Sequence, residues 1–223
     1  MSQEHTRPAD IERTSMSIIA AELQQRGIAL PEETGFVVKR VIHTTADFDY
    51  AEHLVFTPGA VERSLEALRQ GCPIITDTNM AKAGVSKPGL EKLGGWVDCF
   101  MAHPEVIRAA REQGTTRATA SMEKAAREHP GAILAVGNAP TALFEIARRM
   151  ESGLRPGLVI GVPVGFVNVV EAKEQIFALC QELDVPAIVA LGRKGGSNVA
   201  AAICNALIYR ATDMLDPTRR GWN

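Results

Sequence analysis

The segment AILAVGNAP, residues 132–140, decides the fold class of this chain. It runs from an apolar stretch (132–136) through a turn of small and polar residues into a helical pattern that begins near Pro140. The same order recurs at residues 158–168 and 187–198. Stretches that are apolar on both faces are typical of buried parallel strands, and the helices between them cover both faces of the sheet. We therefore predict an α/β protein, a three-layer α/β/α sandwich with a mostly parallel, Rossmann-like sheet.

The rest of the chain continues this alternation. Apolar periodicity and Gly or Pro boundaries predict further elements: helices over 15–25, from Pro58 to Gly71, over 104–113 and over 119–128, and strands over 36–43, 73–77 and 96–101. There is no linker or low-complexity tract. We expect one domain over residues 1–223, with residues 1–9 and 215–223 as peripheral tails.

Composition narrows the classes of partner. The chain has 223 residues, with 24 Lys and Arg against 26 Asp and Glu, which gives a net charge of −2. This balance predicts neither nucleic acid nor a membrane surface as partner. The apolar runs are short, the N-terminus lacks the pattern of a signal peptide, and the four cysteines are widely spaced. We expect a cytoplasmic protein with reduced thiols and no membrane span.

In a parallel sheet the ligand site lies beyond the carboxyl ends of the strands. His43 ends the predicted strand 36–43 there, where an imidazole can give or take a proton near neutral pH, and Thr45 could help to orient it. The alternative is a histidine that caps its own turn. The acidic stretch 47–53 also resembles a metal cluster, but it lacks the H-E-x-x-H spacing, and a solvated loop explains it better. We predict no metal site.

The loop GRKGGSN, residues 192–198, has the composition of an anion site. Its glycines permit close backbone approach, a helix N-terminus follows, and two cations precede the glycines. It is neither a P-loop nor a G-x-G-x-x-G motif, so a nucleotide-binding enzyme stays a minor alternative to a carboxylate ligand. Arg117 stands near a helix start and suits a ligand, although a surface ion pair explains it equally well. Asn168 can be read simply as a helix cap.

Several loop motifs, taken in order, resemble the precorrin-8X methylmutase (precorrin isomerase) family. The resemblance extends from about Asp10 to Met214. It rests on the following motifs: KRVIHTTAD (39–47), DTNM (77–80), TRA (116–118), GNAPTAL (137–143), GVPVGFVN (161–168) and GRKGGS (192–197).

The resemblance implies a homodimeric enzyme without a cofactor, an isomerase of cobalamin biosynthesis. Its reaction is an intramolecular [1,5] shift of a methyl group from C-11 to C-12 of precorrin-8X, which gives hydrogenobyrinic acid; relatives act on the cobalt-containing form. The catalytic histidine of the family matches His43, and Ser17 and Arg40 match substrate-contact positions. Whether the substrate carries cobalt stays open.

Chemistry and location extend this site. The substrate is a large ring edged with carboxylates, which needs a wide cleft such as a dimer interface supplies. We expect substrate contacts from loop residues that can bind carboxylates or let the ring approach: Thr45, Asn79, Arg117, Gly165, Asn168, Gly195 and Gly196, with Arg193 and Lys194 as further cations.

The expected role of His43 follows from the reaction. A methyl shift within one molecule needs no external nucleophile or hydride carrier. We expect His43 to protonate a ring nitrogen or to form a hydrogen bond with it. The alternative function is a non-catalytic tetrapyrrole or corrinoid carrier on the same fold, which would not need this histidine.

Overall fold

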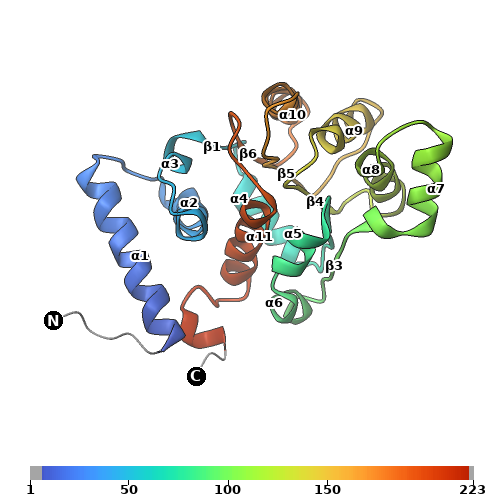
Figure 1. Cartoon of the computed structure of the whole chain (residues 1–223). Coiled ribbons are helices and arrows are strands. Elements are labelled where there is room, and N and C mark those ends of the chain that lie inside the picture. The colour runs from blue at the N-terminus through green and yellow to red at the C-terminus, as the bar shows by residue number, and fades with distance from the viewer. Residues whose placement is uncertain (1–6, 221–223) are drawn as a thin grey trace.

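The computed structural model describes residues 7–220, and these form three layers, a central sheet between two layers of helices (Figure 1). The six strands lie in the order β1-β6-β5-β4-β2-β3, and all neighbouring pairs are parallel except β1 with β6. The predicted fold class is confirmed. The strand bounds are β1 Leu54–Phe56, β2 Ile74–Thr76, β3 Val97–Asp98, β4 Ile133–Val136, β5 Leu158–Gly161 and β6 Ala187–Ala190.

Eleven α-helices and two short 3-10 helices lie within residues 7–220. Their bounds are α1 Pro8–Gln25, α2 Glu32–Thr45, α3 Tyr50–His53, α4 Ala60–Arg69, α5 Asn79–Gly84, α6 Lys87–Lys92, η1 Phe100–Ala102, α7 Pro104–Glu112, α8 Arg117–Glu128, α9 Pro140–Glu151, α10 Val169–Glu182, α11 Ser197–Ala211 and η2 Pro217–Arg220. None of them is both long and apolar enough to cross a membrane.

Alternating strand residues build two cores on opposite faces of the sheet. On β4, Ile133 and Ala135 pack among residues of α2, α4 and α11, whereas Leu134 and Val136 pack among residues of α7 to α10. Both sets are at most 1 % exposed. The period of two that places successive side chains on opposite faces thus requires a helical layer on each side.

Helix α11 lies at the centre of the first layer and contacts α2, α4 and α5 (Figure 1). Its small residues Ala200–Ala202 are nearly inaccessible and let neighbouring helices approach closely. Helix α1 lies outermost. Its principal contacts are with α2 and with the C-terminal turn η2.

The connections that leave β2 and β4 run in opposite directions. From β2 the chain moves outward to β3, whereas from β4 it moves through α9 to β5 on the other side. In α/β sheets, ligands commonly bind at the carboxyl ends of strands where the connections diverge in this way. The N-terminus of α11 reaches the carboxyl end of β2, because Oγ of Ser197 lies 2.7 Å from Oγ1 of Thr78.

The predicted strand over 36–43 is wrong, because these residues lie inside helix α2. Val37, Val38, Val41 and Ile42 are all buried, and their spacing of one, three and one residues makes a single helical face. This face packs on α11. The β-branched content of the segment favours a strand, but burial against a helix prevails over that intrinsic preference.

Other boundaries also differ from the prediction. Within 96–101 only β3 is a strand, and η1 follows it. Strand β1 and the short helices α5 and α6 were not predicted, because segments of three to six residues carry too little periodicity to be recognised. Helix α1 begins at Pro8 rather than at Ser15.

Some residues of the predicted peripheral tails pack against the rest of the protein. Pro8 and Ala9 belong to α1, and Pro217 is buried in η2. The side chain of Arg220 is only 4 % exposed. Residues 1–6 and 221–223 lie outside the described part of the chain.

Candidate active site

His43 lies in the last turn of α2, next to α1. The helix ends at Ala46, which adopts a left-handed conformation (φ 54°) and donates its N–H to the carbonyl of Ile42. Nδ1 of His43 lies 2.8 Å from Oγ of Ser15 on α1. Among residues 7–220, no side chain or backbone group occupies Nε2, so this nitrogen is left for a ligand.

A buried ion pair lies one helical turn below this hydrogen bond. Arg40 donates to Glu12 at 2.6 Å, and each partner precedes its counterpart in the Ser15–His43 pair by three residues. Residues three apart lie on one face of a helix. Two parallel contacts therefore fix α1 to α2 beside the imidazole.

Arg220 completes the ion pair from the C-terminal turn. It donates to Oε1 and Oε2 of Glu12 at 2.9 and 2.7 Å, and its guanidinium stacks on the ring of Tyr209 at 3.9 Å. Burial acts to raise the pKa of Glu12, but the hydrogen bonds from Arg40 and Arg220 hold this pKa below its usual value. One carboxylate shared by two guanidinium groups leaves the cluster with one positive charge.

The pKa of His43 is lowered. Burial is the largest cause, and the positive charge of Arg40 adds to it, whereas Glu12 opposes the shift. Desolvation and a nearby cation both disfavour imidazolium. At neutral pH the side chain is therefore mainly the neutral imidazole, with one nitrogen as donor and the other as acceptor.

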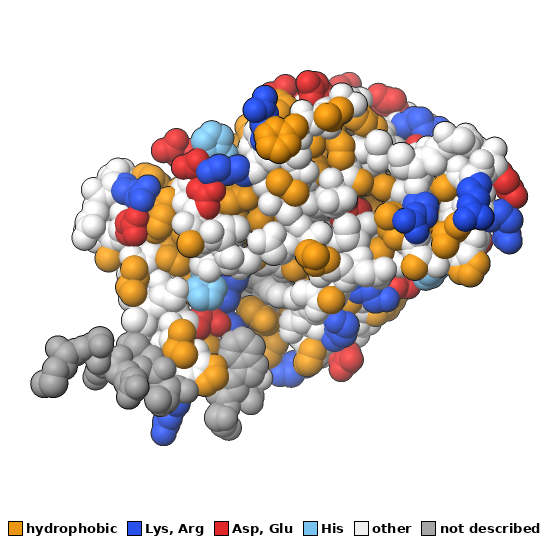
Figure 2. All heavy atoms as spheres, viewed as in Figure 1, with side chains coloured by type: hydrophobic (Ala, Val, Ile, Leu, Met, Phe, Trp, Pro, Cys, Tyr) orange, Lys and Arg blue, Asp and Glu red, His pale blue; other side chains and the backbone are white. Residues whose placement is uncertain are grey.

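His43 lines a cavity of about 540 Å³ between α1, α2 and α11. Figure 2 shows that this face is hollowed between α1 and the body of the protein. The cavity combines an apolar wall with polar groups from four elements: Ile11, Ala201, Ala202 and Tyr209 with Glu12, Arg40, Thr44, Asn198, Asn205 and Arg220. Such a mixture suits a ligand with an apolar body and charged edges.

The loop after β4 is held by a buried carboxylate. Asp77, which is fully buried at the end of β2, accepts the N–H groups of Gly137, Asn138 and Ala139 at 2.8 to 2.9 Å. Burial raises the pKa of Asp77, while these three donors act to lower it. A Cβ on Gly137 would lie 2.7 Å from Cα of Ser197, so only glycine permits the approach to α11.

The loop 192–196 is organised from beneath by a buried lysine. Nζ of Lys173 on α10 donates to the carbonyls of Gly192 and Lys194 at 2.8 and 2.7 Å. Burial lowers the pKa of Lys173 to about 8. Above it, a Cβ on Gly195 would lie 2.1 Å from the carbonyl oxygen of Val162.

Two groups of the predicted anion site already have partners within the described residues. The N–H of Gly196 donates to Val162 at 2.9 Å. Lys194 pairs with Asp47 and Asp49 at 2.6 Å each, and these pairs hold the pKa of Asp47 below its ordinary value. The acidic stretch that suggested a metal cluster thus binds the loop cation.

The other predicted residues divide between the cavity and the loop edge. Arg40 and His43 line the cavity. Ser17 does not, because its hydroxyl donates to the carbonyl of Arg13 and its side chain is exposed. Thr45 donates to Val41 at 2.9 Å, so its hydroxyl is engaged in its own helix.

The remaining predicted residues stay at the carboxyl edge of the sheet. Asn79 and Arg117 are exposed at the first positions of α5 and α8. Gly165 donates to the carbonyl of Arg193 at 3.2 Å. Asn168 begins α10 in a left-handed conformation (φ 56°), and its side chain forms no cap hydrogen bond. None of these four lines the His43 cavity.

Sequence reasoning missed Ser15, Glu12 and Asp77 as functional residues. Glu12 and Ser15 are three residues apart, as are Arg40 and His43, and this equal spacing on two helices could have indicated paired contacts. The prediction of a strand at 36–43 prevented its recognition. Asp77 was recognised as part of a strand end and of the motif DTNM (77–80), but not as the group that holds the loop after β4. Its partners lie 60 to 62 residues away, beyond any local pattern.

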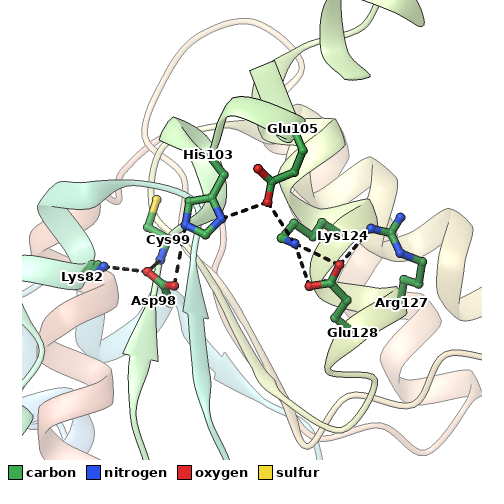
Figure 3. Close-up of polar contacts among 8 residues, drawn as sticks. All are labelled: Lys82, Asp98, Cys99, His103, Glu105, Lys124, Arg127 and Glu128. Atoms are coloured by element: carbon green, nitrogen blue, oxygen red, sulfur yellow. Dashed lines mark hydrogen bonds and ion pairs between the residues drawn. The ribbon is translucent and has the colours of Figure 1, made fainter. Parts of the chain in front are cut away.

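A second polar cluster lies at the β3 edge of the sheet (Figure 3). Asp98 receives Lys82 at 2.6 Å and faces His103 at 3.8 Å. Glu105 and Glu128 bind Lys124 at 3.2 and 2.7 Å. In this cluster each carboxylate has a cationic partner, so its members satisfy one another.

Comparisons with known proteins agree on one family. The family model described as precorrin-8X methylmutase matches residues 10–210. The cobalt-precorrin-8 methylmutase of Salmonella typhimurium is 45 % identical over 207 residues, covering 91 % of this chain and 95 % of that protein. The precorrin-8X methylmutase of Pseudomonas aeruginosa is 36 % identical, covering 88 % of this chain and 93 % of that protein.

A solved structure shows the same fold. The crystal structure of precorrin-8x methyl mutase from Thermus thermophilus superposes with a TM-score of 0.79 at 40 % identity. The match covers 91 % of this chain and 98 % of that one.

Proposed function

Because this chain belongs to the precorrin-8X methylmutase family, we propose that it moves the methyl group of a corrin precursor from C-11 to C-12, with His43 as the catalytic residue. The chain is an isomerase. In this step the bond from C-11 to the methyl carbon breaks, the bond from C-12 forms, and the ring double bonds rearrange. Nothing enters or leaves the molecule.

The observation that carries the role of His43 is its geometry. Nδ1 is taken by Ser15, while the ring lines the cavity. We infer that Ser15 donates to Nδ1, so that the proton of the neutral imidazole resides on Nε2. This N–H donates to a ring nitrogen of the substrate and stabilises the tautomer from which the methyl group migrates. The lowered pKa of His43 supports this neutral form.

The cluster of Glu12, Arg40 and Arg220 supplies the charge that a carboxylate-edged ring requires. Its surplus positive charge lies in the cavity wall. Arginine binds carboxylates with two parallel hydrogen bonds, and a partly buried site strengthens them. We place the substrate carboxylate nearest His43 at this wall, and Arg117 and Asn79 at more distant substituents.

We further propose a homodimer in which a second copy closes the cavity. Ile11 and Ile18, 49 % and 60 % exposed, lie on α1 beside His43 and line a groove with it. Large exposed apolar side chains next to an open cavity suit a protein interface. Sedimentation of the protein and of Ile18→Glu tests this: we expect a dimer that the charge dissociates. A wild-type monomer at assay concentration contradicts it.

The reaction is tested with both substrates in parallel. Purified protein is incubated with precorrin-8X and with its cobalt-containing form, and the visible spectrum is followed, because the methyl shift changes the ring conjugation. We expect turnover of at least one substrate, and a loss of roughly 10²- to 10⁴-fold in His43→Ala. Binding without any spectral conversion would instead support the carrier function.

A further inference from the structure

We propose that Arg220, in the C-terminal turn, is a positioning residue that acts through Glu12 to hold Ser15 against His43. The turn η2 lies beyond residue 210, where the match to the family model ends. The inference concerns this chain's own C-terminus and rests on the catalytic role proposed for His43.

The first step is the connection between the turn and α1. The outermost helix has its principal contacts on α2 and η2, so the C-terminal turn is one of its two supports. Figure 1 shows η2 beside the N-terminal end of α1. Within this support, Nη1 of Arg220 donates to both carboxylate oxygens of Glu12 and forms a buried ion pair.

The second step is the rigidity of Arg220 itself. Its Nε donates to the carbonyl of Met214 at 2.8 Å, and Nη2 donates to the carbonyl of Leu215 at 2.8 Å. Its guanidinium also stacks on Tyr209 of α11. The guanidinium is therefore fixed to the body of the protein, and Glu12 is fixed to it.

The third step leads from Glu12 to the imidazole. Glu12 and Ser15 are three residues apart on one face of α1. Moving Glu12 displaces Ser15 from Nδ1 of His43, because the two contacts are parallel connections between the same two helices. Arg40 alone binds only Oε1 of Glu12, whereas Arg220 binds both oxygens and sets the rotation of the carboxylate.

Charge gives this role a measurable signature. Arg220 is one of the cations that lower the pKa of His43, and Glu12 opposes it. Loss of the Arg220 charge raises the pKa of His43. Loosening of α1 acts in the same direction, because it admits water to the imidazole. A residue that only stabilised the fold would leave kcat unchanged. The pKa of His43 also responds directly to the charge of Arg220, so a variant that keeps this charge is needed to separate the two causes.

The experiment compares Arg220→Met with Arg219→Met. Arg219 lies in the same turn but is exposed and reaches only the carbonyl of Asp213, so it is the matched control. The pKa of His43 is measured by NMR titration of the free protein, and kcat and KM are measured with the converted substrate. We expect a raised pKa and a kcat lowered roughly 3- to 30-fold in Arg220→Met, with neither change in Arg219→Met.

Arg220→Lys keeps the charge but loses the hydrogen bonds of Nε and Nη2 to Met214 and Leu215 that fix the guanidinium, and we expect values between those of wild type and Arg220→Met. It also serves as the informative variant if Arg220→Met does not fold. An unchanged His43 pKa and kcat in folded Arg220 variants overturn the proposal, even if their Tm falls. If the wild-type protein converts neither corrin precursor, the proposed function fails, and the NMR titration alone decides the role of Arg220.

Discussion

Oγ of Ser15 lies 2.8 Å from Nδ1 of His43, and this contact joins the outermost helix of the protein to the helix that carries the imidazole. The bond fixes the ring of His43 and selects the nitrogen that faces the cavity. Ser15, and not Ser17, is the serine that contacts the imidazole.

Replacing Ser15 by alanine removes the hydrogen bond that fixes the orientation of the His43 ring. One neutral hydrogen bond contributes about 1 kcal/mol, so we expect Ser15→Ala to lower kcat roughly 3- to 10-fold. The matched control is Ser17→Ala, two residues along the same helix, where the hydroxyl contacts only its own backbone. Steady-state kinetics on both variants decides the matter. Equal kcat values for the two would refute the assignment.

Activity should depend on pH through the neutral form of His43. Because burial and Arg40 lower its pKa, we expect kcat/KM to stay constant as the pH falls through 6.5 and to decline only below that value. If protonated His43 were instead the catalytic acid, kcat/KM would rise as the pH is lowered. The pH–rate profile of the wild-type protein distinguishes the two.

The same shift predicts an effect on stability. As the pH falls from above 6.5, His43 is protonated in the unfolded chain at a higher pH than in the folded protein. The free energy of unfolding therefore decreases as the pH falls through the lowered pKa of the folded state. His43→Gln lacks this contribution. We expect urea denaturation to show a smaller decrease in the free energy of unfolding for the variant over this interval. Parallel curves for the two proteins would contradict the lowered pKa.

Lys173 should affect stability at alkaline pH. Its pKa is about 8 in the folded protein and 10.5 ordinarily, so between these values the unfolded state binds more protons and stability rises with pH. Lys173→Met removes that rise. Urea denaturation from pH 8 to 10.5 measures it, with exposed Lys87→Met as control. If Lys173→Met keeps the slope of the wild type, the lysine is not buried as described.

Gly195 should tolerate no side chain. A Cβ there would lie 2.1 Å from a backbone oxygen, and overpacking of this kind costs about 1–3 kcal/mol. We expect Gly195→Ala to lower the free energy of unfolding by that amount and to displace the loop beneath it. Gly131→Ala, where nothing lies within 4 Å, should stay within about 0.5 kcal/mol of wild type. Thermal and urea denaturation of the two variants provide the comparison.

The sequence predicted β4, β5 and β6 because their composition and their boundaries mark buried strands even over four residues. Strands β4, β5 and β6 are apolar on both faces and end at glycine-containing turns, and each was placed within a few residues. Helix α2 was mistaken for a strand, since its β-branched residues suit either element. Only the presence of α11 as a partner decides between them.

For the site, the sequence determined the chemical inventory and the family, whereas tertiary structure decided which groups meet. His43 and Arg40 were identified from local motifs, because a resemblance of motifs is a property of neighbouring residues. Ser15, Glu12 and Arg220 join the cluster around His43 and Arg40 only through contacts across 28 and 208 residues. Lys194 and the N–H of Gly196 likewise bind partners that are distant in the chain, namely Asp47 with Asp49 and the carbonyl of Val162. A side chain's availability depends on which partners folding brings to it, and those partners are distant in the chain.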